Sequence, residues 1–185
     1  MASCWLATPP IVSGRVECGL RPLAISGLCY TSGSWHRSYK HGSEPAEEAI
    51  GFGQGVGELR GEVEGSLVWA NFPRRRQDGV WTPNLRGCIK TRQDEEILIS
   101  IHGQSILEIG PGQRRAILAR IELTTELERY RWLNTCFLVG EGEIDEDTDE
   151  WWLTTYVCVN QEAEGAPALG SEAPERYRTA VRPRS

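Results

Sequence analysis

The chain has 185 residues, the size of one ordinary domain with further residues at its ends. Hydrophobic residues make up 39% and charged residues 25%, so the chain has enough apolar material for one core and is not disordered throughout. The 20 Lys and Arg against 26 Asp and Glu give a net charge of −6. This charge argues against a general nucleic-acid-binding surface, because such a surface is basic.

Three zones differ in composition. Residues 1–45 mix Ser, Gly and Pro without a lasting period, which predicts an N-terminal extension of uncertain structure. Residues 46–160 carry the regular patterning and predict one β-domain. Residues 161–185 are rich in Ala, Glu, Pro and Arg and have no apolar face to bury, so we expect a disordered tail.

The middle zone predicts short β-strands separated by turns. The clearest alternation places Ile97, Ile99 and Ile101 on one face of a strand and His102 on the other. Seven such strands predict an all-β fold, a sandwich or a small antiparallel barrel, and the acidic run 145–150 predicts an exposed hairpin loop. In chain order, the predicted strands are Glu58–Glu64, Ser66–Phe72, Leu85–Thr91, Glu96–His102, Arg115–Leu123, Arg131–Val139 and Trp151–Asn160.

A series of motifs in this zone is similar to those of a known family. The motifs are Gly53-x-Gly55-x-x-x-Leu59-x-Gly61, Gly65-Ser66-Leu67 with Trp69, Arg76-x-Asp78-Gly79, Gly87-x-Ile89-x-Thr91, Arg129-Tyr130-x-Trp132-Leu133-Asn134 and Val139-Gly140-x-Gly142. The series resembles the family called domain of unknown function 3237, also labelled UPF0311, over about residues 50–160. The resemblance implies a compact antiparallel β-barrel of the lipocalin-like (calycin) type, and it implies no settled activity.

Polar residues on both sides of Pro73 form the first candidate site. Asn71 and Arg76 could bind a ligand oxygen, and Asp78 could orient the Arg76 guanidinium, whose fork suits a carboxylate or phosphate. The alternative is an exposed loop with solvated charges. Trp69, in the strand before this loop, is the candidate apolar wall.

Two residues are candidate acid–base groups. His102 could act as a base near neutral pH if its strand face points into the barrel. The opposite face carries three isoleucines and is the stronger core face, so an exposed His102 is the alternative. Glu141, in Gly140-Glu141-Gly142, is the first-ranked carboxylate, with a solvated hairpin position as its alternative.

The most specific piece of the resemblance supplies the last candidates. On a strand, Tyr130, Trp132 and Asn134 alternate onto one face, where the two rings could wall a pocket and the amide could hold a ligand oxygen. An internal structural network is the equal alternative, because buried Trp and Tyr also need hydrogen-bond partners.

Signatures of cofactor chemistry are missing from the sequence. The glycine-rich stretch 51–57 lacks GxGxxG spacing and leads into a predicted strand, so we expect no nucleotide cofactor. The six cysteines lack zinc-ligand spacing, so we expect no metal. No apolar stretch is long enough to span a membrane and no ordered signal peptide is recognisable, so we expect a cytoplasmic protein without a membrane partner.

Together these features predict a barrel that binds an apolar or aromatic small molecule. It could be a cofactor-independent enzyme of the isomerase, cyclase or lyase type. The alternatives are a non-catalytic ligand-binding protein and an oligomeric interaction protein. The adjacent Trp151 and Trp152 point to opposite faces of a strand, which modestly favours a homo-oligomer.

Overall fold

The computed structural model describes residues 24–41, 48–107 and 113–159. The predicted tail 161–185 and residues 1–23 of the predicted extension lie outside the described residues. The described part contains ten strands and one 3-10 helix: β1 (Ala24–His41), β2 (Ala49–Gly61), β3 (Gly65–Asn71), β4 (Arg74–Arg75), β5 (Trp81–Thr82), β6 (Asn84–Thr91), β7 (Glu96–Leu107), β8 (Arg114–Thr124), η1 (Glu128–Thr135), β9 (Phe137–Asp145) and β10 (Glu150–Val159).

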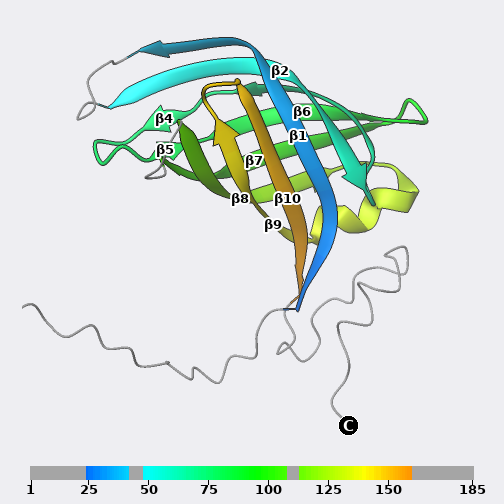
Figure 1. Ribbon diagram of the computed structural model, residues 1–185. Helices are drawn as coiled ribbons and strands as arrows, with labels where there is room; N and C mark the ends of the chain where they lie inside the picture. Colours follow the sequence, from blue (N-terminus) through cyan, green and yellow to red (C-terminus); the bar gives the residue numbers. More distant parts are fainter. Residues whose placement is uncertain (1–23, 42–47, 108–112, 160–185) are drawn as a thin grey trace, which may run out of the picture.

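Eight of these strands form a closed antiparallel β-barrel (Figure 1). Going round the barrel, the order is β1, β2, β3, β6, β7, β8, β9 and β10, and the β1–β10 pairing closes the circle. The short strands β4 and β5 form a hairpin that joins β2 to β7 at one end of the barrel. The predicted all-β antiparallel barrel is therefore confirmed.

The barrel begins earlier in the chain than the predicted boundary at residue 45. Strand β1 pairs with β10 on one side and with β2 on the other, so residues 24–41 are part of the barrel wall. The alternation was hard to recognise because β1 is rich in Ser and Gly. A register shift between Trp35 and Arg37 also interrupts the two-residue period, as a β-bulge does.

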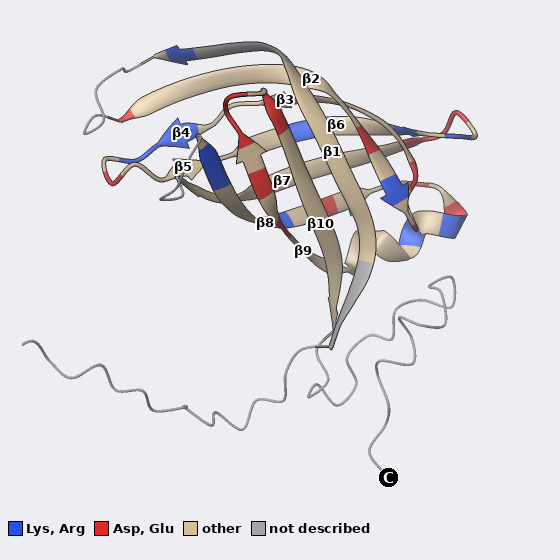
Figure 2. Ribbon diagram, in the orientation of Figure 1, with Lys and Arg blue, Asp and Glu red and all other residues tan. Residues whose placement is uncertain are grey.

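The core consists of the inward-facing residues of the eight strands. Ile97, Ile99 and Ile101 are buried, whereas their neighbour Leu98 is 58% exposed on the outer face. The predicted isoleucine core face is therefore confirmed. Figure 2 shows that charged residues gather at the hairpins and strand ends, while the middle of the wall is mostly uncharged.

Glycines on the inner face of the wall make room for a column of three indole rings. Trp35 and Trp69 meet edge to face with ring centroids 4.5 Å apart, and Trp69 and Trp151 are 5.8 Å apart. A Cβ atom at Gly53 would lie 1.9 Å from the Trp35 ring, and one at Gly33 would lie 2.4 Å from the Trp151 ring. The glycine-rich stretch of β2 therefore provides space for tryptophan.

The helix η1 covers the end of the barrel at which β1 begins and β10 ends (Figure 1). Here the predicted strand Arg131–Val139 is wrong in its first half, because η1 runs to Thr135 and β9 begins only at Phe137. The consecutive residues Trp132 and Leu133 are both buried in the core. A strand would point them to opposite faces, whereas a helical turn directs both under the barrel.

Within the described ranges, the one helical segment, η1, is too short and too polar to cross a membrane.

Candidate ligand-binding site

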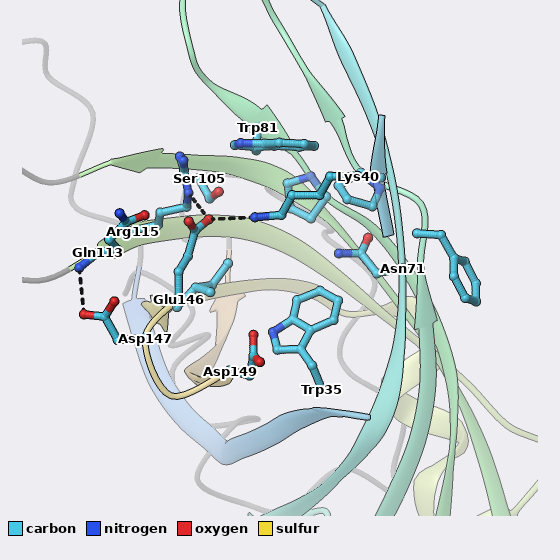
Figure 3. Close-up of a pocket in the computed structure, with 15 residues that line it drawn as sticks. Trp35, Lys40, Asn71, Trp81, Ser105, Gln113, Arg115, Glu146, Asp147 and Asp149 are labelled. Atoms are coloured by element: carbon cyan, nitrogen blue, oxygen red, sulfur yellow. Dashed lines mark hydrogen bonds and ion pairs between the residues drawn. The ribbon is translucent and has the colours of Figure 1, made fainter. Parts of the chain in front are cut away.

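A cavity of about 340 Å³ lies at the end of the barrel opposite η1 (Figure 3). This open end is formed where β1, β3, β7 and β9 finish and where β2, β6, β8 and β10 start. The β4–β5 hairpin and the β9–β10 loop border it. The lining residues are Trp35, Lys40, Gly51, Phe52, Asn71, Pro73, Trp81, Pro83, Ser105, Gln113, Arg115, Ile144, Glu146, Asp147 and Asp149.

The cavity arises because the inward rows of several strands change from apolar to polar at this end. Along β7 the inward row passes from Ile101 to Ser105, and along β8 it passes from Ile117 to Arg115. The same change occurs in β3, where Asn71 follows Trp69. Because inward positions repeat every second residue, these polar groups converge on one space above the apolar core.

Two indole rings lie on opposite sides of the cavity (Figure 3). Trp35 is the top ring of the indole column, so it forms a floor between the cavity and the core. Trp81, in β5, forms the opposite wall and is buried against β7 through its pairing with Ser105. Aromatic walls of this kind favour a flat apolar ligand body.

Charged side chains form one wall of the cavity. The Arg115 Nε donates a hydrogen bond of 2.7 Å to Glu146 Oε1, and Lys40 Nζ lies 3.6 Å from the same oxygen. Lys40 Nζ also lies 5.8 Å from the centroid of the Trp81 ring. Two cations thus share one carboxylate, and the three side chains carry a net positive charge.

The remaining polar groups differ in how firmly they are held. The backbone N–H of Asn84 donates to Asn71 Oδ1 at 2.8 Å, which leaves the amide nitrogen of Asn71 facing the cavity (Figure 3). Asp147 Oδ2 accepts a hydrogen bond of 3.2 Å from the backbone N–H of Gln113. The Asp149 carboxylate lies beside the Trp35 ring at the mouth of the cavity.

The structure brings part of the first candidate group to this end of the barrel. Asn71 lines the cavity, and Trp69 lies directly below it in the indole column. Arg76 and Asp78 lie in the turn between β4 and β5, where they form an exposed ion pair of 2.6 Å. The predicted orientation of Arg76 by Asp78 is therefore present, in the exposed loop that was the alternative interpretation.

The two predicted acid–base groups lie on the outer wall. His102 is exposed and pairs with Asn84 and Arg120 on the neighbouring strands, which matches the alternative reading of that strand. Glu141 is exposed and accepts a hydrogen bond of 2.9 Å from the Tyr156 hydroxyl. This hydrogen bond to a carboxylate raises the pKa of Tyr156. The positions of both residues separate them from the cavity.

The third candidate group lies at the closed end. Trp132 is buried in the core, and Tyr130 stacks with the Arg129 guanidinium 4.6 Å from its ring centroid. The Asn134 amide makes two hydrogen bonds of 2.9 Å with Thr125, accepting from its N–H and donating to its carbonyl. The group therefore forms a structural network around η1, the second of the two interpretations of this motif.

The described cysteines are free thiols. Burial in the barrel wall raises the pKa of Cys29 to about 11, and burial near η1 raises that of Cys136 to about 11. Both thiols therefore stay protonated at neutral pH and are poor nucleophiles.

The residues that define the cavity are not among the candidates predicted from the sequence; they are chiefly Trp35, Trp81, Ser105, Arg115 and Glu146. A signal for two of them was present. Extending the inward alternation of β7 by four residues beyond Ile101 reaches Ser105, and extending that of β8 back from Ile117 reaches Arg115. Trp81 lies in the two-residue strand β5 and Glu146 in the β9–β10 loop, and neither segment is long enough to show a period that predicts the direction of a side chain.

Comparisons with known proteins identify the fold. No family model and no curated protein matches the chain. It is similar to a solved protein of unknown function from Clostridium acetobutylicum, with a TM-score of 0.66, 12% identity, and coverage of 75% of this chain and 100% of that one. It is also similar to a β-barrel-like protein from Acinetobacter baumannii, with a TM-score of 0.65, 15% identity, and coverage of 75% and 98%.

A further solved structure is described as an enzyme from Penicillium herquei. Its TM-score is 0.58 and its identity 16%, with coverage of 75% of this chain and 96% of that one. At such identities the three likenesses establish a shared barrel fold, and function rests on the site of this chain itself.

Proposed function

We propose that this protein binds one small molecule with an apolar or aromatic body in the cavity at the open end of its barrel. The observation that carries the proposal is the cavity itself, with about 340 Å³ of space above a closed core. Ligand sites in proteins span about 300–1,000 Å³. The matching ligand is therefore a compact molecule of one or two rings.

The chemistry of the lining supports the same ligand class. Trp35 and Trp81 offer indole rings on opposite sides of the cavity, and Pro73 and Pro83 add apolar contacts. A few polar groups, among them the Asn71 amide, can fix the orientation of the ligand. This combination of mostly apolar walls and few convergent polar groups is typical of small-molecule sites.

The catalytic form of the proposal is a cofactor-independent enzyme of the isomerase, cyclase or lyase type. Such reactions need a proton acceptor and a group that stabilises negative charge, and the cavity places the Glu146 carboxylate beside the Arg115 guanidinium. The alternative is a carrier that binds the same ligand without changing it. A Glu146→Gln variant that binds the ligand but no longer converts it would support the enzyme, and the absence of any product from the wild type would support the carrier.

We also propose that the chain is a distant, cytoplasmic member of the domain of unknown function 3237 family, with a calycin-type barrel. The motif series over about residues 50–160 supports this assignment.

The test of ligand binding uses intrinsic fluorescence, because Trp35 and Trp81 face the cavity. A library of one- and two-ring compounds is screened for quenching and for a rise in Tm, since a ligand that binds only the folded state stabilises it. Trp81→Ala removes one wall and is expected to weaken binding at least about tenfold. Trp152→Ala, on the outer face, is the matched control; equal weakening by both variants would contradict the proposal.

A second candidate function is assembly of copies of this chain through the outer wall. The exposed residues Val56, Val68 and Leu98 lie along one cross-strand row, with Cys88 between the last two. Burial of such a row is a common driving force for association. Light scattering would show a homo-oligomer that Val68→Lys converts to a monomer; a monomeric wild type would exclude this candidate.

A further inference from the structure

One buried donor in the cavity wall is left without a partner. The Arg115 side chain is only 12% exposed, and its Nε is bonded to Glu146. Its Nη1 is buried and has no hydrogen-bond partner among the residues that the structure describes. A buried cationic N–H group without an acceptor is costly and uncommon in folded proteins, so it indicates where an acceptor from outside the protein would bind.

The position of Arg115 on its strand directs its side chain toward the ligand space. Arg115 shares the inward face of β8 with Ile117 and pairs with Ile144, another lining residue. Its guanidinium lies beside Ser105, on the side of the cavity toward the edge of the Trp81 ring (Figure 3). An acceptor bound there would also be within the same part of the cavity as the Ser105 hydroxyl.

The charges around Arg115 favour an anionic acceptor at this point. Among the described residues, Glu146 is the one carboxylate bonded to Arg115. It is shared with Lys40, so the three groups together keep one positive charge. The other lining carboxylates, Asp147 and Asp149, belong to the exposed β9–β10 loop at the mouth. Solvent screens these exposed carboxylates, and the exposed Lys40 ammonium, more strongly than the buried Arg115–Glu146 pair. The Arg115 N–H donor that has no partner among the described residues therefore favours the anion.

We propose that the ligand is an aromatic anion, with a carboxylate, phenolate or enolate oxygen on the Arg115 guanidinium and its ring between Trp35 and Trp81. This inference rests on the proposed function, because it specifies the ligand class of the same cavity. A charged oxygen suits the site better than a neutral one, since hydrogen bonds between two ionised groups are the stronger kind.

The test uses two fluorescent probes that share one aromatic body. Naphthalene-2-sulfonate carries an anionic group, and its parent naphthalene is uncharged; both have the two-ring size expected for the cavity. We expect the wild type to bind the sulfonate probe at least about tenfold more tightly, as a charge-assisted hydrogen bond implies. The two probes must also displace each other, because both occupy the same cavity.

Two variants assign the preference to its residue. Arg115→Met keeps much of the side-chain volume and removes the charge, so we expect it to bind both probes with similar affinity. Arg120→Met is the matched control, because Arg120 lies on the outer face of the same strand, where it pairs with Glu122. The control should keep the wild-type preference. Arg115→Lys keeps the charge and should retain part of the preference for the sulfonate probe. This variant tests the proposal if Arg115→Met does not fold.

The outcomes separate the two proposals. If neither probe nor any library compound binds in the cavity, the proposed function fails. If both probes bind and compete in the wild type with equal affinity, or if Arg115→Met and Arg120→Met keep the same preference, the cavity binds ligands but the anion proposal is overturned. Binding of the sulfonate probe without displacement of its parent would overturn it as well.

Discussion

The two ends of the barrel are built from the same wall and finish in opposite ways. At the closed end, η1 places the apolar side chains of Trp132 and Leu133 under the core. At the open end, the inward rows finish in Asn71, Ser105 and Arg115, and a cavity remains above the Trp35 ring. From this contrast in residues we infer that the closed end serves stability, whereas the open end leaves polar groups where a ligand can reach them.

The largest expected effect lies at the closed end. Trp132 is 3% exposed, so Trp132→Ala removes a large buried ring and is expected to lower the free energy of unfolding by about 3–5 kcal/mol. Denaturant unfolding measures this loss. The affinity for the naphthalene probe, measured under conditions in which the variant stays folded, is expected to remain unchanged.

The Trp132 variant also tests whether the two ends of the barrel have separate roles. A loss of stability no larger than that of Trp152→Ala, on the outer face, would show that η1 does not close the core. A loss of probe affinity in the folded variant would show that the two ends are coupled.

Much of the fold could be predicted from the sequence, because strand alternation directly reflects burial. The isoleucine face of β7 and an all-β fold, a sandwich or a barrel, were predicted from this pattern, and the family resemblance implied the barrel. Strand β1 was missed because its inner positions include Thr31 and Gly33, which carry no hydrophobic signal. Such small residues are needed there, since the Trp151 ring fills the space beside Gly33.

The site was harder to predict than the fold. The most specific motif of the family resemblance, around Trp132 and Asn134, lies at the closed end and contributes structure. The cavity instead combines residues such as Lys40, Arg115 and Glu146, which are far apart in sequence and meet only when β1, β8 and β9 are wrapped into a barrel. A distinctive sequence motif can therefore mark a structural constraint as readily as a ligand site.

The second-largest effect is expected in the indole column, which lies between the two ends of the barrel. A Cβ atom at Gly53 would lie 1.9 Å from the Trp35 ring, so Gly53→Ala must displace that ring. Overpacking of this kind costs about 1–3 kcal/mol of unfolding free energy. Because Trp35 is the floor of the cavity, the variant should also lose probe affinity. Unchanged affinity would show that Trp35 does not contact the ligand.

A smaller effect is expected from Asn134, which holds η1 to the end of β8. Asn134→Ala removes two hydrogen bonds with the Thr125 backbone and should cost about 1–2 kcal/mol of unfolding free energy. Asn134→Asp keeps the acceptor and loses the donor, so its cost should be intermediate. Both variants should bind probes as the wild type does. Weakened binding in either variant would show that Asn134 contributes to ligand binding.

The outer wall should respond least. His102 is exposed, so His102→Ala should change the free energy of unfolding by less than about 0.5 kcal/mol and should not alter probe affinity. Denaturant unfolding and probe titration measure both quantities. A loss of affinity would mean that the ligand reaches the outer face, which would contradict the assignment of the site to the open end.

The smallest effect concerns the Tyr156–Glu141 pair on the same outer wall. The protonated Tyr156 hydroxyl donates to the Glu141 carboxylate, which raises the pKa of Tyr156 in the folded protein. Glu141→Ala should therefore lower that pKa toward its ordinary value, which an ultraviolet titration of the tyrosines can detect. Because the pKa is raised by folding, the pair stabilises the protein below the ordinary tyrosine pKa, and this stabilisation is lost as pH rises through the raised value. A stability difference between wild type and variant that persisted above that pH would show that Glu141 acts through packing instead of through the hydrogen bond.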